Sequence, residues 1–380
     1  MKKNTVFDHP AVAIIGMSGM FAGSENLDAY WRILLGGIDC ITDPPEGRTD
    51  LNAYFSTDPK QPDHIYCKRG GFLPAIAFDP TEFGIPPSAI EATDTSQLLG
   101  LVGAKMALAD AGYGDDKEGV DHQRTSVILG ITGTQELVIA LGSRLGHPIW
   151  RRAISGKGLD DRQKSAIMDE ISDSYVSWQE NSFPGLLGNV VAGRICNRLN
   201  LGGTNCGVDA ACASSLGALH LALLELYTGS SDMVVTGGVD TLNDIFMHMC
   251  FSKTGVLSHT GDARPFSENA DGTVLGEGIG MVVLKRLDAA RRDNDRIYAV
   301  IRGIGASSDG KSQSIYAPRA DGQARALSAA YDHAGVGPET IGLVEAHGTG
   351  TRVGDGVEFS ALKKVFGPVS KNGKCALGSV

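Results

Sequence analysis

The chain has 380 residues, a hydrophobic content of 42% and 50 glycines, which suit a large α/β protein with many tight turns. Its net charge of −10 and isoelectric point of about 5.4 disfavour a nucleic-acid-binding protein. No apolar run approaches the roughly 20 residues of a membrane-spanning helix. Asp8, His9 and Pro10 interrupt any signal-peptide pattern, so we expect a cytoplasmic protein without a membrane span.

Short apolar runs alternate with longer helical patterns along the chain. Buried strands are predicted at 12–16, 126–132, 232–239, 280–287, 298–305 and 341–348. Helices are predicted at 96–112, 214–229, 321–335 and 354–367, several of which end on glycine. This alternation predicts an α/β fold with a mostly parallel sheet.

Two further segments stand out from this alternation. The stretch from about 140 to 180 is more polar, and we expect it to be an insertion or a set of partner-facing helices. The last residues, 374–380, form an apolar run that predicts the start of another strand. Because a domain rarely ends inside a strand, we expect the sequence to be a truncated piece.

The seven cysteines show no CxxC spacing, and their number is odd. This pattern disfavours a disulfide framework and a structural zinc site, so no metal is predicted. For six of them, a small buried side chain is the better interpretation; these are Cys40, Cys67, Cys196, Cys206, Cys250 and Cys375.

The seventh, Cys212, lies in the stretch DAACASSLGALH, where a helical pattern begins at or just after the thiol. A helix N-terminus favours the thiolate and lowers the thiol pKa. The neighbouring alanines and serines leave room for a substrate chain, and the same backbone amides could hold an oxyanion. Taken alone, a buried structural cysteine would be the slightly better interpretation.

The second feature is the stretch EAHGTGTRVGDGVEF at 345–359, in which His347 follows a predicted strand. Catalytic groups of open α/β sheets gather at the carboxyl ends of strands. A neutral imidazole there can donate a hydrogen bond to a thioester oxygen. Thr349 and Thr351 offer hydroxyls to a polar substrate arm or cap the loop, and Asp355 and Glu358 could cap the next helix or organise the histidine.

Other motifs suggest different functions. The stretch GASSDGKS, Gly305 to Ser312, fits the phosphate-binding P-loop pattern after an apolar strand, so a nucleotide-binding protein is the main alternative. A P-loop needs a helix that starts at the GKS, whereas Pro318 and a helical pattern beginning near Asp321 argue against one. The GEGIG turn at 276–280 precedes a strand, the wrong order for a dinucleotide site. A cysteine protease is not suggested by the long strand-rich pattern.

Four segments resemble the β-ketoacyl synthases, the condensing enzymes of fatty acid and polyketide synthesis. They are VDAACASSLGALH around Cys212, EAHGTGTRVGD around His347, and the stretches at 12–31 and 263–290. The resemblance covers nearly the whole chain. The stretches at 177–203 and 305–327 are most similar to the ketosynthase of bacterial polyunsaturated fatty acid synthases, with iterative type I polyketide synthases next.

This resemblance implies a thiolase-like α/β fold, in which two related βαβ halves form α-β-α-β-α layers. We expect the first half at 1–250, with the nucleophile, and an incomplete second half at 251–380. It also implies a homodimer, with the strand near 232–240 or its surroundings at the interface.

For function, the resemblance implies a decarboxylative Claisen condensation that extends an acyl chain by two carbons. Cys212 is the acyl-accepting nucleophile and His347 one of two catalytic histidines. Thr349 and Thr351 contact the phosphopantetheine arm, and Glu358 supports the site together with Asp355. No bound cofactor is implied, because substrates are carried on an acyl carrier protein.

Partners follow from the same resemblance. One expected partner is the acyl carrier protein, for which Arg151, Arg152 and Lys157 are weak docking candidates. The other expected partners are further synthase domains of a parent chain. The family's second histidine is not among these residues, so we expect this fragment not to complete condensation. A non-catalytic scaffold is the remaining alternative.

Overall fold

The computed structural model describes residues 9–48, 50–114, 122–133, 135–311, 314, 316–367 and 375–380. Its strands are β1 Val12–Phe21, β2 Ile41–Thr42, β3 Gly70–Gly71, β4 Thr125–Ile131, β5 Asn205–Val208, β6 Met233–Asp240, β7 Leu275–Gly276, β8 Gly278–Arg286, β9 Ala299–Ile301, β10 Leu343–Glu345 and β11 Ala376–Gly378. Its α-helices are α1 Leu27–Gly36, α2 Pro87–Ile90, α3 Thr95–Asp110, α4 Glu136–Leu145, α5 His147–Ser155, α6 Asp161–Asp173, α7 Ser182–Gly185, α8 Asn189–Arg198, α9 Ser214–Thr228, α10 Ile245–Thr254, α11 Leu287–Arg292, α12 Ala320–Ala334 and α13 Arg352–Phe366. Short 3₁₀ turns lie at Leu51–Tyr54, His122–Arg124 and Pro338–Thr340.

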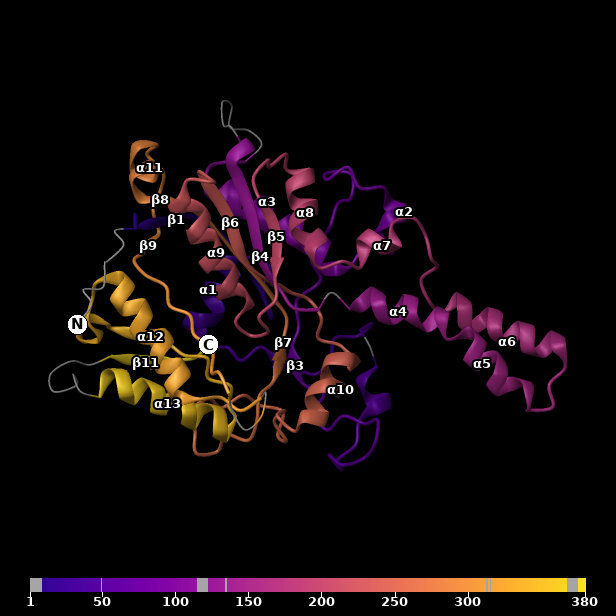
Figure 1. Cartoon of the computed structure of the whole chain (residues 1–380). Helices are drawn as coiled ribbons and strands as arrows, with labels where there is room; N and C mark the ends of the chain where they lie inside the picture. Colours follow the sequence, from indigo (N-terminus) through magenta and orange to yellow (C-terminus); the bar gives the residue numbers. More distant parts are fainter. Residues whose placement is uncertain are drawn as a thin grey trace.

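The central element is a six-stranded sheet in the order β5-β4-β6-β8-β1-β9 (Figure 1). Strands β5, β4 and β6 run parallel, whereas β8, β1 and β9 pair antiparallel with their neighbours. The expected α/β fold is confirmed, but the mostly parallel sheet is wrong. A strand buried on both faces has the same apolar pattern in either direction, so periodicity alone cannot give its orientation.

Helices cover both faces of this sheet. On one face, α3 and α8 pack against a core that includes Ile15, Leu129 and Met281. On the other face, α9 packs against Ile128, Val234 and Leu284. Alternate residues of one strand therefore enter two different cores, which explains the uninterrupted apolar runs of β4 and β6.

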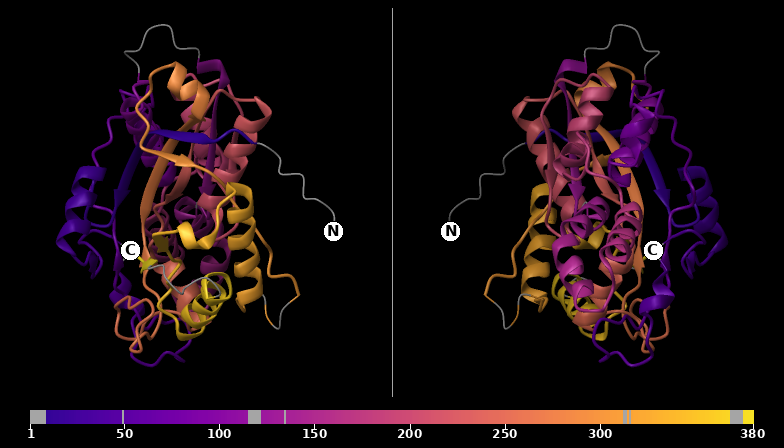
Figure 2. Two further views of the ribbon diagram at one scale, coloured as in Figure 1. Left: turned by 90° about the vertical axis from the view of Figure 1, so that its left-hand side faces the viewer. Right: turned by 90° about the vertical axis from the view of Figure 1, so that its right-hand side faces the viewer.

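A smaller region, residues 302–380, lies on the α9 side of the sheet (Figures 1 and 2). Its two strands β10 and β11 pair in parallel, and α12 packs against α13. The strand expected in the final apolar run is thus confirmed as β11. Strands β8 and β9, which follow residue 250, belong to the large sheet. The division into halves at residue 250 stays a prediction.

The two regions repeat one contact between an extended segment and a helix. A Cβ added at Gly16 in β1 would lie 2.6 Å from the carbonyl oxygen of Ala107 in α3. A Cβ added at Gly303, just after β9, would lie 2.5 Å from the carbonyl oxygen of Ala330 in α12. Each glycine lets a helix lie directly on the extended backbone, so the chain uses the same βα unit twice.

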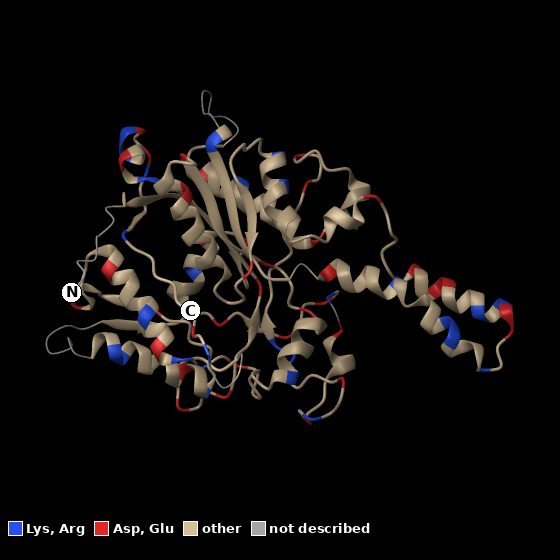
Figure 3. Ribbon diagram, viewed as in Figure 1, with Lys and Arg blue, Asp and Glu red and all other residues tan. Residues whose placement is uncertain are grey.

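Helices α4, α5 and α6 form an arm that projects away from the sheet (Figure 1). In α5 no residue is buried, and in α6 only Met168 is buried. This arm is the polar segment expected near 140–180, and its outer helices carry charges of both signs, as Figure 3 shows. The helical interpretation of the segment is confirmed, and its role as a partner surface stays a prediction.

Among the described residues, one helical stretch, Ala211–Thr228, has the length and the apolar composition that would allow it to cross a membrane. It consists of the nucleophile turn and α9, which packs against β4, β5, β6 and β8. We therefore interpret it as a core helix of this fold.

Candidate active site

Cys212 lies in a tight turn between β5, which ends at Val208, and α9, which begins at Ser214. The residue before it, Ala211, has φ +50°, in the left-handed region that residues with a side chain seldom adopt. The turn presents the Cys212 side chain at the surface, two residues before the helix. The residue that precedes the helix is Ala213, whose methyl side chain cannot cap the backbone N–H groups of the first turn.

His347 comes from the smaller region, in the loop between β10 and α13. Its backbone N–H donates to Oε1 of Glu358 at 2.8 Å, and the N–H of Gly348 donates to Oε2 at 2.9 Å. One carboxylate on α13 therefore holds the backbone on both sides of the imidazole. Of the two roles predicted for Glu358, the structure shows it organising the histidine loop.

The side chains of Cys212 and His347 meet in the fold. The two residues are 135 positions apart in the sequence (347 − 212 = 135). The side-chain hydrogen bond with His347 lowers the pKa of the Cys212 thiol below its usual value, although partial burial opposes it. The charge of His347 and the backbone N–H of Cys212 itself lower this pKa further. In the same way, the hydrogen bond with Cys212 raises the pKa of His347 against partial burial, and the charges of Cys212, Glu358 and Asp355 add to the rise. Together these shifts favour a thiolate–imidazolium pair.

Asp355 is buried and ties the histidine loop to a neighbouring segment. Its Oδ1 accepts from the N–H of Gly350 at 3.1 Å, and its Oδ2 accepts from the N–H of Phe266 at 2.7 Å. The N–H of Gly272 also donates to the carbonyl of Gly350 at 3.0 Å. The segment at 263–290 therefore bonds both to the loop and to the first turn of α13.

The two predicted substrate-contact threonines take part in the local structure of this loop. Thr351 is the N-cap of α13, and its Oγ1 accepts from the N–H of Gly354 at 3.1 Å. The hydroxyls of Thr349 and Thr351 lie 2.8 Å apart. The capping role is thus visible, and contact with a substrate arm stays a prediction.

A pocket of about 350 Å³ opens beside the nucleophile. Its lining residues come from the ends of β1, β4, β6 and β8 and from the turn; they are Phe21, Gly130, Thr132, Ala211, Cys212, Ser214, Ser215, Gly238, Val239, Asp240, Gly278 and Gly280. A Cβ on Gly130 would lie 2.4 Å from the backbone of Ser214, so only glycine lets the start of α9 approach β4 this closely. Burial raises the pKa of Asp240 to about 6, which adds a carboxyl of reduced acidity to the pocket wall.

Thr132, directly after β4, was not predicted as a functional residue. Its hydroxyl lies 3.1 Å from Oδ1 of Asp209 and 3.0 Å from Oγ of Ser214, on the two sides of the Cys212 turn. Thr132 lies 80 residues before Cys212 in the sequence (212 − 132 = 80), in a segment that contains no recognisable motif. The one sequence feature that could have indicated Thr132 is its place at the end of the strand predicted at 126–132. A polar residue at the carboxyl end of a buried strand is a candidate site residue.

A second hollow of about 580 Å³ lies on the other face of the β4 end. Ile131 and Gly133 line it, whereas Gly130 and Thr132 line the pocket with Cys212, as strand alternation requires. Val138 of α4 and Phe246 of α10 complete its apolar wall. This hollow is therefore separate from the space into which the thiol opens.

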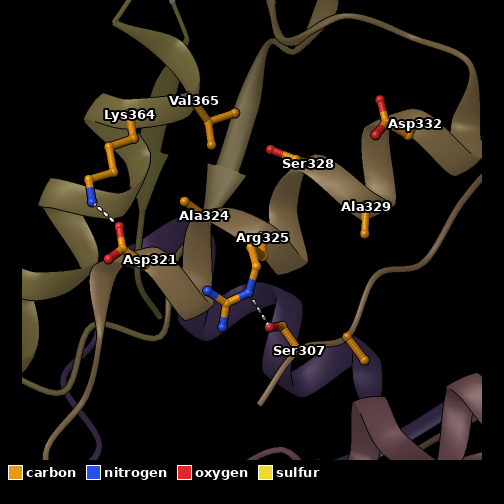
Figure 4. Close-up of a pocket in the computed structure, with 10 residues that line it drawn as sticks. Ser307, Asp321, Ala324, Arg325, Ser328, Ala329, Asp332, Lys364 and Val365 are labelled. Atoms are coloured by element: carbon orange, nitrogen blue, oxygen red, sulfur yellow. Dashed lines mark hydrogen bonds and ion pairs between the residues drawn. The ribbon is translucent and has the colours of Figure 1, made fainter. Parts of the chain in front are cut away.

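A third hollow, about 750 Å³, lies between α12 and α13, and Cys212 and His347 are not among its lining residues. Figure 4 shows that its cations are already paired: Lys364 contacts Asp321, and Nε of Arg325 donates to Oγ of Ser307 at 3.2 Å. Because neither reacting residue lines it, we assign no ligand to it.

The P-loop alternative fails on the geometry of its described part. Residues 305–311 are followed by α12 only at Ala320, so no helix N-terminus lies at Lys311. Instead, the carbonyl of Lys311 accepts from Nη1 of Arg319 at 2.9 Å. Ser312 lies outside the described residues. The nucleotide-binding function is therefore not favoured.

The sequence also matches known families and proteins. The family model "Beta-ketoacyl synthase, N-terminal domain" matches residues 9–290, and "Beta-ketoacyl synthase, C-terminal domain" matches 298–380. A polyunsaturated fatty acid synthase of Thraustochytrium is 43% identical over 372 residues, which are 97% of this chain and 13% of that protein. Polyketide synthase PksN of Bacillus subtilis is 36% identical over 97% of this chain and 6% of its own length.

Solved structures give the same result. The ketosynthase from module 6 of the bacillaene synthase of Bacillus subtilis has a TM-score of 0.79 and 35% identity, over 97% of this chain and 57% of that one. The PfaC ketosynthase–chain length factor has a TM-score of 0.85 and 30% identity, over 98% of this chain and 39% of that one. The thiolase-like fold predicted from the sequence is thereby confirmed. The chain belongs to the β-ketoacyl synthase family.

Proposed function

We propose that this chain carries the nucleophile of a ketosynthase, an acyltransferase that extends an acyl chain on a carrier protein by decarboxylative Claisen condensation. The observation that carries the proposal is the meeting of Cys212 and His347, which lowers the thiol pKa. The relatives named above are synthases of polyunsaturated fatty acids and polyketides, and this chain spans only a small part of each.

The first half-reaction is acyl transfer. The Cys212 thiolate attacks the carbonyl carbon of an acyl thioester, and the carbonyl oxygen takes the negative charge. The backbone N–H of Cys212, at the mouth of α9, is suited to stabilise this oxyanion. The carrier thiol leaves with a proton that His347 supplies, and an acyl–Cys212 thioester remains.

The second half-reaction forms the carbon–carbon bond. A malonyl thioester loses CO₂, and its carbonyl oxygen takes the charge as an enolate, which His347 stabilises by hydrogen bonding. The enolate carbon attacks the acyl–Cys212 carbonyl and expels the thiolate. The product is a 3-ketoacyl thioester two carbons longer, and the carbon atoms balance with the CO₂ released.

The resemblance implies a second histidine for this step, which is not among residues 1–380. We therefore expect a polypeptide of these residues alone to form acyl–Cys212 and not to complete condensation. The substrate arm is the phosphopantetheine of a carrier protein, for which Thr349 and Thr351 are the proposed contacts. A cytoplasmic location stays a prediction.

We also propose that the chain acts as a homodimer next to other synthase domains. Of the interface predicted at the strand near 232–240 or its surroundings, the strand itself is β6, which lies between β4 and β8 with both edges occupied, so we propose the surroundings. The free edge of the sheet beside the nucleophile is β5, whose residues alternate between exposed and intermediate burial. An edge strand of this kind is suited to pairing with a second copy. For the carrier, Arg151, Arg152 and Lys157 on and just after the exposed α5 stay docking candidates.

The test is acylation of the full-length protein with an acyl-pantetheine thioester, followed by intact mass and peptide mapping. We expect one acyl group, located on Cys212 and absent from Cys212→Ala. Cys250 is the matched control within the chain, because it is also exposed but comes from α10. Equal labelling of Cys250 and Cys212, or none on a folded protein, would favour the non-catalytic scaffold.

A further inference from the structure

We propose that Thr132 is a positioning residue that holds the Cys212 turn in its reactive conformation. This inference rests on the proposed function and extends it to a residue outside the two family motifs. It depends on three features: the backbone of Ala211, the hydrogen bonds of the turn and the alternation of β4.

The conformation of Ala211 requires support from its surroundings. A residue with a side chain in the left-handed region is strained, and such strain persists where the neighbouring structure imposes it. Ala211 at φ +50° immediately precedes the nucleophile, so its backbone sets the direction of the Cys212 side chain. If Ala211 relaxed to an ordinary φ, the thiol would move away from His347.

Hydrogen bonds hold this residue on both sides. Oδ1 of Asp209 accepts from the N–H of Ala211 at 3.0 Å, and Oγ of Ser214 donates to the carbonyl of Ala211 at 2.6 Å. Ser214 is buried, and its Oγ also accepts from the N–H of Ala210 at 2.9 Å. The two side chains therefore clamp one peptide group on each side of the strained residue.

Thr132 joins these two side chains. Its hydroxyl donates to Asp209 Oδ1 at 3.1 Å and lies 3.0 Å from Ser214 Oγ. It directly follows β4, which is buried along its whole length and fixes its position. Thr132 thus connects both side chains of the clamp to a central strand of the sheet.

The position of Thr132 after β4 fits this role. Gly130 and Thr132 are two residues apart and face the same side of the strand. At Gly130 the missing side chain lets the start of α9 approach the strand, and at Thr132 the hydroxyl donates to Asp209 at the start of the Cys212 turn. One strand end therefore determines both the distance and the orientation of the turn.

The experiment measures single-turnover acylation of Cys212 in the full-length protein at several acyl-pantetheine concentrations. Thr132→Val has the same shape and lacks the hydroxyl. We expect its limiting acylation rate to fall about tenfold, the size of one hydrogen bond to a carboxylate, with little change in the half-saturating concentration. Thr132→Ser restores the hydroxyl and is expected to restore most of the rate.

The sharper arm is the double variant Thr132→Val/Ala211→Gly, compared with Ala211→Gly alone. Glycine adopts positive φ without strain, so the turn then needs less support. We expect the loss caused by Thr132→Val to shrink to about twofold in this background. Thr228→Val is the matched control, because its hydroxyl bonds at the far end of α9, and its rate should equal that of the parent.

Two results would overturn the inference. One is a Thr132→Val protein with an unchanged limiting rate, and the other is the same tenfold loss in the Ala211→Gly background. Selective acylation of Cys212 in the parent protein separates these results from failure of the proposed function, since that failure would appear before any Thr132 variant is compared.

Discussion

The two regions of this chain repeat one βα contact but differ in how much structure surrounds it. In the large sheet, Gly16 lies against α3 in a core closed on both faces. In the smaller region, Gly303 lies against α12, while β10 and β11 form a two-stranded sheet with Leu343 and Leu377 exposed. The first region is a rigid support, and the second depends on loops and helix caps.

The active site combines one residue from each region. Cys212 comes from the turn supported by β4, and His347 comes from a loop held by carboxylates of α13. The comparison therefore predicts that changes in the first region affect the nucleophile itself, whereas changes in the second affect the partner that activates it.

The largest effects are expected from the two reacting residues. Cys212→Ala should abolish acyl transfer, because no second thiol with a lowered pKa lies in the pocket among the described residues. His347→Ala should leave a thiol that still acylates about 100-fold more slowly, the usual effect of losing a positioned acid or base. Single-turnover acylation measured by intact mass distinguishes the two. Equal loss in both variants would contradict the division of roles.

The next effect is expected at the carboxylate that holds the histidine loop. Glu358→Gln keeps the size of the side chain but loses the charge that accepts from the N–H groups of His347 and Gly348. We expect a loss of about 1–2 kcal/mol in unfolding free energy, since charge-assisted hydrogen bonds exceed neutral ones and the loop is partly exposed. The rate of Cys212 acylation should fall as well, because the same loop carries His347.

Chemical denaturation and the acylation rate measure these two effects. Glu170→Gln on the exposed arm is the matched control and should change neither. A stable Glu358→Gln protein with full activity would show that the loop holds its conformation without the carboxylate.

The sequence predicted the two reacting residues because each lies in a contiguous motif. It did not predict Thr132, since the network of Thr132, Asp209 and Ser214 forms only when β4 and β5 pair in parallel. It also missed α10, whose buried residues are the polar His248 and Ser252, so the helix lacks the amphipathic period that indicates one. The four-residue strand β5 is too short for alternation to be recognised.

The repeated glycine contact gives a direct comparison of the two regions. Gly16→Ala should cost about 1–3 kcal/mol of stability, because the new methyl group would overlap α3 in a closed core. Gly303→Ala should cost less, because α12 buries only one of its residues and can shift. Urea unfolding measures both. A larger loss of stability in Gly303→Ala than in Gly16→Ala would show that the smaller region, and not the large sheet, is the more rigid of the two.

A glycine elsewhere controls for the substitution itself. Gly142 lies inside α4, where an added Cβ meets nothing within 4 Å. Gly142→Ala is expected to stabilise the protein by up to about 1 kcal/mol through helix propensity alone. Destabilisation at this position would mean that the arm is packed against something in solution.

The smallest effect is expected at the cap of α13. Thr351→Ala removes the side chain that accepts from the N–H of Gly354, and we expect a loss of about 1 kcal/mol. Thr351→Ser should retain the cap. If the threonine only caps the helix, the half-saturating pantetheine concentration should stay constant in both variants. A selective rise in that concentration would instead support the predicted contact with the substrate arm.

The central claim, that His347 activates Cys212, is tested most directly by the pH dependence of iodoacetamide alkylation at Cys212. The hydrogen bond between the two side chains lowers the pKa of Cys212 and raises that of His347, so it favours the thiolate–imidazolium form. Reactivity should therefore rise as pH increases through a midpoint below the usual cysteine value. In His347→Ala the Cys212 midpoint should move up. An unchanged midpoint in His347→Ala would contradict the account.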